Sequence, residues 1–204
     1  MANTPARTSS TAPSKTDTVK QRAFIIGIAL ALMWGLEVID LVIGQRLDSL
    51  GIEPRTATGL IGIPLAPLLH GGFGHLLANT IPFAVLGFLT IMRGVSTFFV
   101  VTAFVTIVGG LFVWIVGSNG YHIGASGLIF GYFGYNLAMG IFERSLTSIA
   151  LAVVVGVLYG SMIFGVLPGR PGVSWEGHLF GAASGAALAW LTGRKKAQAK
   201  KAAA

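Results

Sequence analysis

The sequence contains a serine and several histidines whose surroundings suit proton transfer. Ser126 lies in the segment Gly124-Ala-Ser-Gly, and His178 directly follows Gly177; each stands at the start of an apolar stretch. The other histidines are His70, His75 and His122. A serine hydroxyl within hydrogen-bond reach of an imidazole is the minimum requirement for an activated nucleophile. Ser126 and His178 are therefore the first candidate pair.

Small residues indicate how this pair can meet. They recur at helical spacing in two stretches: Gly127, Gly131 and Gly134 in one, and Gly177, Gly181 and Gly185 in the other. Faces of this kind let membrane helices approach closely. If the two faces pack together, Ser126 and His178 lie near each other at the ends of their helices.

Further donors accompany the pair. His75 and Asn79 are four residues apart, so on a helix they share one face. A helix that begins at Ser126 also has free backbone N–H groups at its first turn, which can bind a developing oxyanion. A metal site is the alternative use of several histidines. However, no histidine pair has the HExxH pattern, the chain has no cysteine, and Glu176 points to a different helix face from His178. We therefore expect no metal and no cofactor.

Composition determines which elements can position these groups. Of 204 residues, 53% are hydrophobic, only 10% are charged, and 29 are glycine. A soluble domain carries about 25% charged residues. The apolar residues also fall in runs of about 20, the length of a membrane-spanning helix. A water-soluble globule is excluded, and the sequence predicts one integral membrane bundle.

Six spans are predicted, at residues 23–44, 73–92, 95–117, 124–142, 147–167 and 175–193. Residues 1–22, rich in Ser, Thr, Ala and Pro, are expected to be a disordered tail, and 194–204 a basic tail. The connection 45–72 mixes prolines with apolar patches, so we expect it to lie on or in the membrane interface.

The distribution of basic residues predicts the orientation. With six spans, all but three of the 14 Lys and Arg residues fall on one side; the exceptions are Arg46, Arg55 and Arg170. The positive-inside rule then places both termini in the cytoplasm. All four histidines come to lie near the opposite face. Aromatic residues do not interleave with the basic clusters at the chain ends, so nucleic-acid binding is not expected.

Three motifs in this order resemble those of one family. His70-x4-His75-x3-Asn79, Gly124-x-Ser126-Gly127 and Gly177-His178 followed by Gly181 are similar to the second-, fourth- and sixth-span motifs of rhomboid intramembrane serine proteases. The resemblance covers residues 23–193. It implies an all-α polytopic membrane protein, a six-helix rhomboid-like bundle with both termini cytoplasmic.

The resemblance also implies roles for individual residues. Ser126 would be the nucleophile and His178 the general base, in a dyad without a carboxylate. His75, Asn79 and the backbone N–H of Ser126 would form the oxyanion hole, and His70 would be structural or line the entrance. Substrates of the family are single-span membrane proteins, cut in or near the span within a hydrated cavity that opens outward. Residues 166–174 would cap this cavity, and the fifth span would be a lateral gate.

Two positions depart from the family pattern. Phe130 stands where some members have a tyrosine that packs on the base, and Pro54-Arg55 stands where some have Trp-Arg. Phenylalanine can stack on His178 but cannot donate a hydrogen bond. Because His178 must be neutral to accept a proton, activity is expected to fall on acidification below the ordinary histidine pKa of about 6.5.

Glu37 and Asp40 on the first span leave alternatives open. They could serve a proton-coupled transporter, since intramembrane carboxylates mark proton paths. We favour pairing with Arg46 or Arg55 instead. A non-proteolytic relative that chaperones membrane proteins is a further alternative. We expect a bacterial inner membrane location, while the substrate and the oligomeric state remain open.

Overall fold

The computed structural model describes residues 15–202, which form eight α-helices. In chain order these are α1 (Lys15–Val42), α2 (Ala57–Leu65), α3 (Phe73–Met92), α4 (Val95–Phe104), α5 (Gly110–Val116), α6 (Ser126–Phe142), α7 (Leu146–Tyr159) and α8 (Trp175–Ala202). A π-helical turn, Val105–Gly109, joins α4 to α5, and 3-10 turns occupy Leu47–Leu50, Ala66–Leu68 and Gly160–Val166. The predicted all-α class is confirmed for this part of the chain.

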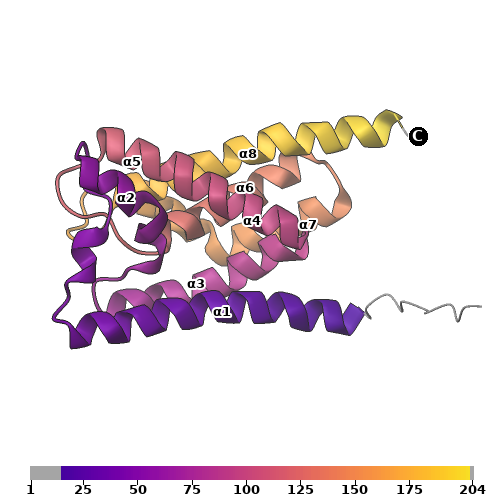
Figure 1. Cartoon of the computed structure of the whole chain (residues 1–204). Helices are drawn as coiled ribbons and strands as arrows, with labels where there is room; N and C mark the ends of the chain where they lie inside the picture. The colour runs from indigo at the N-terminus through magenta and orange to yellow at the C-terminus, as the bar shows by residue number, and fades with distance from the viewer. Residues whose placement is uncertain (1–14, 203–204) are drawn as a thin grey trace, which may run out of the picture.

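The helices form one bundle. The start of α1 and the end of α8 lie at the same end of it, whereas α2 and its flanking connections lie at the other (Figure 1). Within residues 15–202, four helical runs are long and apolar enough to cross a membrane: Thr18–Val42, Phe73–Met92, Val95–Val116 and Leu146–Val166. α6 has only 17 residues, and α8 has a low mean hydropathy because it continues into the basic C-terminal segment. Each of the six predicted spans overlaps a helix; six crossings and the orientation remain predictions.

The first helix starts earlier than expected. α1 begins at Lys15, so residues 15–22, assigned from sequence to a disordered tail, are helical. The remainder of that tail lies outside the described residues. The basic segment after residue 193 continues α8 to Ala202.

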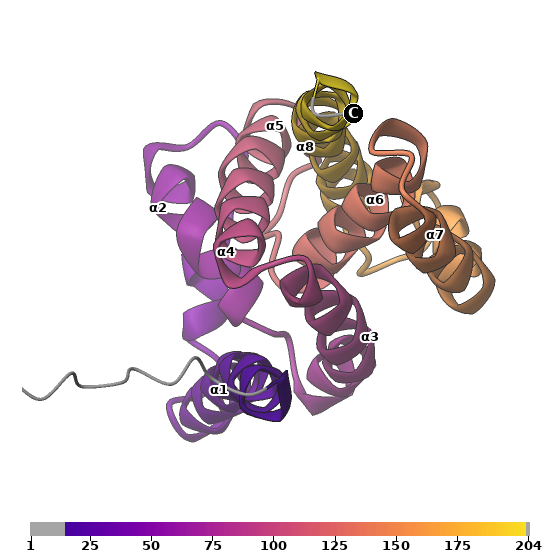
Figure 2. The same cartoon turned by 90° about the vertical axis from the view of Figure 1, so that its right-hand side faces the viewer.

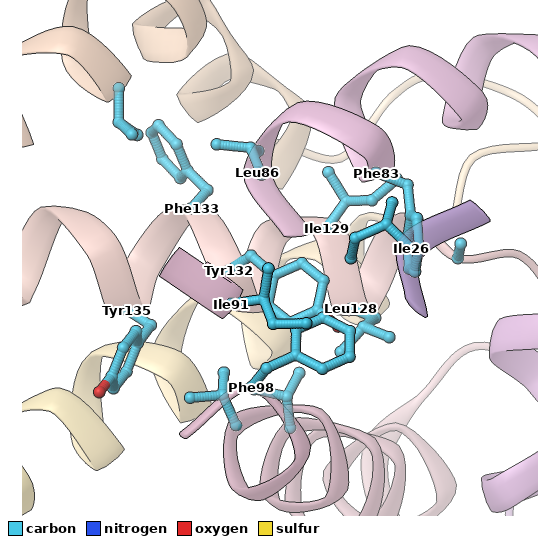
Figure 3. Packing of buried hydrophobic residues seen from close by; sticks show 14 of the residues in the cluster. Ile26, Phe83, Leu86, Ile91, Phe98, Leu128, Ile129, Tyr132, Phe133 and Tyr135 are labelled. Carbon is cyan, nitrogen blue, oxygen red and sulfur yellow. The ribbon is translucent and has the colours of Figure 1, made fainter. Parts of the chain in front are cut away.

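α6 is the central helix and the main source of the core. It lies among α3, α4, α7 and α8 (Figure 2). The buried Tyr132 stacks on Phe98 with ring centroids 5.6 Å apart and contacts Phe83 at 5.9 Å (Figure 3). Its hydroxyl lies 2.7 Å from the Thr102 hydroxyl, so its polar group is satisfied in the core. This packing holds α6, whose first residue is Ser126, in a fixed position.

Glycines bring α6 and α8 into backbone contact. A Cβ added at Gly181 would collide with the carbonyl oxygen of Gly127, and one at Gly185 with that of Gly131. One at Gly134 would meet the backbone of Ala182. The sequence predicted this close approach from small-residue spacing. It places the first turns of the two helices side by side.

The connection between α1 and α3 is folded against the segment that precedes α6. Ile52 and His122 exchange both backbone hydrogen bonds, at 3.0 and 2.9 Å. The Arg55 guanidinium donates to the carbonyl oxygen of Gly117 at 2.7 Å and to the side chain of Asn119 at 2.8 Å. The connection therefore holds the turn 117–124 that leads into Ser126.

Candidate active site

Ser126 occupies the first position of α6, after a sharp turn. Gly124 has φ +109°, and its N–H donates to the carbonyl oxygen of Ala66 at 2.9 Å. A positive φ of this kind favours glycine, which has no Cβ. As the first helical residue, Ser126 has a backbone N–H without a carbonyl acceptor within the helix. The turn therefore presents the Ser126 hydroxyl and its N–H together at the helix start.

His178 lies in the first turn of α8 and is only 9% exposed. Its Nδ1 is 2.9 Å from the carbonyl oxygen of Gly165. A carbonyl can only accept, so Nδ1 carries the proton and Nε2 of the neutral ring is left as an acceptor. Phe130 covers one face of the imidazole, with centroids 4.1 Å apart and planes 7° from parallel. Two contacts therefore set the tautomer and the orientation of this ring.

Ser126 and His178 line the same cavity, which has a volume of about 690 Å³. His75, Asn79 and Phe130 line it as well. These residues come from α3, α6 and α8. The segments 118–123 and 172–174, the end of α7 and the 3-10 turn that follows it also contribute to the wall. The cavity thus brings together the five side chains selected from sequence for nucleophile, base, base packing and oxyanion donors.

His75 and Asn79 present donors to this cavity. The Gly71 N–H approaches Nδ1 of His75 at 3.4 Å, so Nδ1 accepts and Nε2 carries the proton of the neutral ring. A Cβ added at Gly124 would lie 2.7 Å from this Nε2. Because Gly124 precedes Ser126 by two residues, the donor lies beside the turn that leads into the serine. The Asn79 amide donates to the backbone oxygen of His75 at 2.8 Å and retains its second N–H.

His70 supports the turn before Ser126 and does not line the cavity. It is 2% exposed, and its Nε2 accepts from the Ala125 N–H at 3.3 Å. Burial, reinforced by the nearby His75, lowers the pKa of His70 to about 4, because an apolar environment disfavours the charged ring. The neutral ring can therefore act as an acceptor at neutral pH. This contact is with the turn and not with the cavity, and the structural role of His70 stays a prediction.

Several supporting contacts were not predicted from sequence. His122 contacts the Ser174 hydroxyl at 2.6 Å through Nδ1 and the Ser118 carbonyl oxygen at 2.9 Å through Nε2. Ser174 also accepts from the Gly177 N–H at 3.1 Å, an N-cap contact for α8. The Glu176 carboxylate accepts from the Ser118 N–H at 3.0 Å. These bonds join the turn before Ser126 to the helix start that carries His178.

The roles of Ser174, Glu176 and Gly165 were not predicted from sequence, for physical reasons. A serine just before a helix is a common cap, and this was the available signal for Ser174. Gly165 acts through its carbonyl oxygen, which every residue possesses. Glu176 was considered only as a metal ligand, because its backbone partner is distant in sequence. Gly177 keeps its expected place next to His178, where an added Cβ would lie 2.8 Å from the Ser174 hydroxyl.

The expected pairing of Glu37 and Asp40 with Arg46 or Arg55 is wrong. Both carboxylates are buried, and Asp40 accepts from the Leu47 N–H at 2.7 Å. Arg55 bonds instead to the turn 117–119, and the one salt bridge between described residues joins Arg93 to Glu143. Neither Glu37 nor Asp40 lines the 690 Å³ cavity.

Comparison with known proteins identifies the family of this chain. Residues 57–195 match the Rhomboid domain. An uncharacterized Mycobacterium tuberculosis protein is 43% identical over 199 residues, which cover 91% of this chain and 83% of that protein. An uncharacterized Mycobacterium leprae protein is 44% identical over 171 residues, covering 79% and 68%. The Bacillus subtilis protein named "Putative rhomboid protease YdcA" is 35% identical over 133 residues, covering 63% and 65%. With its domain match and its apolar helices, the chain belongs to the rhomboid family of integral membrane proteins.

Proposed function

We propose that this protein is an intramembrane serine endopeptidase that uses Ser126 as nucleophile and His178 as base. The observation that carries the proposal is the hydrogen bond from His178 Nδ1 to Gly165, which leaves Nε2 as an acceptor in the cavity that Ser126 also lines. Membership of the rhomboid family supports the same reaction class.

The reaction follows the serine-protease scheme. Nε2 of His178 takes the Ser126 hydroxyl proton as the oxygen attacks the scissile carbonyl carbon. The imidazolium then gives this proton to the leaving amine as the C–N bond breaks. Water, deprotonated by the same nitrogen, hydrolyses the acyl-enzyme and restores the Ser126 hydroxyl.

Three donors surround the position where the oxyanion forms. They are the backbone N–H of Ser126, Nε2–H of His75 and the second amide N–H of Asn79. Removing one oxyanion donor from a serine protease costs about 100- to 1,000-fold in rate. His70 accepts the preceding N–H, that of Ala125, so this donor is used to hold the turn.

The dyad has no carboxylate partner in this scheme. In triads an aspartate fixes the histidine tautomer and stabilises the imidazolium. Here the Gly165 carbonyl oxygen fixes the tautomer. Its dipole, together with the face of Phe130, stabilises the positive ring. Stacking by Phe130, without a hydrogen bond, thus replaces the tyrosine that some family members have at this position.

Substrates are proposed to be single-span membrane proteins that enter beside α7. The run Leu146–Val166 supports this, because few of its apolar residues are buried inside the bundle. Most of this helix therefore faces away from the bundle interior, where a substrate helix can lie against it. The proposal also includes six membrane crossings, cytoplasmic termini, a catalytic unit over residues 23–193 and a location in a bacterial inner membrane. The bacterial relatives support the last of these.

The proposal is tested in proteoliposomes with a synthetic single-span peptide that carries Ala and Gly near its outer end. Wild-type protein is expected to produce a shorter fragment, identified by mass spectrometry, and Ser126→Ala none. Ser96→Ala, an exposed serine on α4, is the matched control and should cleave like wild type. Equal cleavage by wild type and Ser126→Ala, or the same intact peptide recovered from both, would overturn the proposal.

A further inference from the structure

A second cavity lies far from the candidate active site. It has a volume of about 440 Å³ and is formed by the C-terminal end of α6 and the last turns of α8. Its lining includes Ile141, Phe142, Arg144, Trp190, Arg194 and Gln198. Ser126 is the first residue of α6 and Phe142 the last, so the length of this helix separates the cavity from the candidate nucleophile. The cavity therefore lies at the end of the bundle where α1 starts and α8 ends (Figure 1).

Two arginines face this cavity. Arg144 has φ +55°, and its Nε donates to the Ile141 carbonyl oxygen at 3.3 Å, which leaves the outer guanidinium nitrogens as further donors. Arg194 lies over the Trp190 ring, 5.5 Å from its centroid. A guanidinium presents several N–H donors in a planar fork that matches a phosphate group.

No carboxylate of the described residues pairs with these two arginines. The one salt bridge between described residues is Arg93 to Glu143, at 3.2 Å. Glu143, although adjacent to Arg144 in sequence, also accepts from the Ser148 hydroxyl at 2.7 Å. Both guanidinium groups thus retain donors and charge for an anion in the shared cavity.

The same cavity has an apolar rim at the surface of the bundle. Ile141 is 64% exposed and Trp190 is 45% exposed. Tryptophan beside arginine is typical of the membrane–water boundary, where the ring contacts acyl chains and the charges contact headgroups. A ligand that matches this lining is anionic at one end and apolar at the other.

We propose that this cavity binds the headgroup phosphate of an anionic phospholipid such as phosphatidylglycerol. The phosphate accepts from Arg144 and Arg194, and the acyl chains pack on Ile141 and Trp190. Basic cavities between helices are the usual headgroup sites of membrane proteins. The carbonyl end of α6 repels an anion, so its own dipole offers no attraction and both arginines are needed. A bound lipid joins the ends of the two helices whose opposite ends carry Ser126 and His178.

The test measures thermal melting of the detergent-purified full-length protein during titration with a short-chain lipid. Dioctanoyl-phosphatidylglycerol is compared with dioctanoyl-phosphatidylcholine and with inorganic phosphate, and the apparent Kd is taken from the rise in Tm. Phosphatidylglycerol is expected to raise Tm, and the other two are expected to leave it unchanged. Labelling of the protein by a serine-directed probe confirms folding independently of lipid.

Variants distinguish a site from general charge attraction. The double variant Arg144→Gln with Arg194→Gln is expected to weaken binding about 100-fold, since each hydrogen bond between charged groups is worth about tenfold or more. Lys20→Gln with Lys195→Gln removes the same charge from exposed positions and should cost less than about fivefold. If the double variant Arg144→Gln with Arg194→Gln fails to fold, Arg194→Lys takes its place in the test. This variant keeps the charge, loses the planar guanidinium and is expected to weaken binding about tenfold. The proposal would be overturned if both double variants lost binding equally or if Arg194→Lys bound as tightly as wild type. An equal response to phosphatidylcholine or inorganic phosphate would also overturn it.

Discussion

Phe130 lies flat on His178, with the two ring centroids 4.1 Å apart and the ring planes 7° from parallel. Phe130 is on α6, one turn after Ser126, so the helix that carries the proposed nucleophile also carries the surface on which the proposed base rests. At the edge of the same imidazole, Gly165 accepts the Nδ1 proton. The orientation of His178 therefore depends on two residues that do no chemistry themselves.

Replacing Phe130 tests the stacking contact. Phe130→Leu keeps an apolar side chain but removes the ring, and an aromatic contact is worth about 0.5–1.5 kcal/mol. We expect labelling of Ser126 by a fluorophosphonate to slow by about 2- to 10-fold, while Phe130→Tyr keeps the wild-type rate. If Phe130→Leu labels as fast as wild type, the ring does not position His178.

Gly165 offers a sharper test of the same ring. A Cβ at this position would lie 2.7 Å from Phe130 Cζ and 3.3 Å from His178 Nδ1, so Gly165→Ala should displace one of the two rings. We expect the labelling rate to fall by more than about tenfold, because a small misplacement of a catalytic group is costly. Gly160→Ala, at a glycine with open space around it, is the control and should react normally. Equal labelling rates for Gly165→Ala and Gly160→Ala would contradict the proposed positioning of His178.

The contact between α6 and α8 predicts a loss of stability. Gly181→Ala pushes a methyl group against the carbonyl oxygen of Gly127, and overpacking of this kind costs about 1–3 kcal/mol. The melting temperature should fall by about 2–12 °C in a chain of this length. Gly35→Ala, where nothing lies within 4 Å, should melt within about 2 °C of wild type. A Gly181→Ala variant as stable as the Gly35→Ala variant would mean that the helices can separate without cost.

His70 predicts a pH dependence of stability. Its pKa is lowered to about 4 in the folded protein, against about 6.5 in the unfolded chain, so the unfolded state binds the proton first on acidification. Stability should therefore be full above about pH 6.5 and fall between about pH 6.5 and 4, by up to about 3 kcal/mol. Melting measured at pH 7.5 and 5 should show this loss in wild type and a smaller one in His70→Gln, whose side-chain oxygen can still accept from Ala125. An equal loss in both proteins would assign the pH dependence to another group.

Sequence patterns anticipated the parts of this molecule that depend on residue type and spacing. The approach of α6 to α8 follows from small residues such as Gly127 and Gly181, because only small side chains permit it. The shared face of His75 and Asn79 follows from helix geometry. Their gathering in one cavity with Ser126 and His178 follows from the order of the spans.

Other parts depend on backbone groups or on contacts between distant segments. Gly165 acts through a carbonyl oxygen, which leaves no mark in sequence. Asp40 binds the N–H of Leu47 instead of an arginine, because the chain turns sharply after α1 and brings this donor close. The bond between Glu176 and Ser118 spans 58 positions and needs the packed helices to exist.

The most direct test of the central proposal is to locate the serine that a fluorophosphonate probe modifies in the detergent-purified protein. The probe needs a nucleophilic serine but no substrate, so the result does not depend on knowing the natural target. We predict that peptide mapping finds the adduct on Ser126 in wild type and in Ser96→Ala, and that Ser126→Ala and His178→Ala remain unlabelled. A folded wild-type protein that takes up no probe, or labelling that persists in Ser126→Ala, would contradict the assignment of Ser126 and His178 as a catalytic dyad.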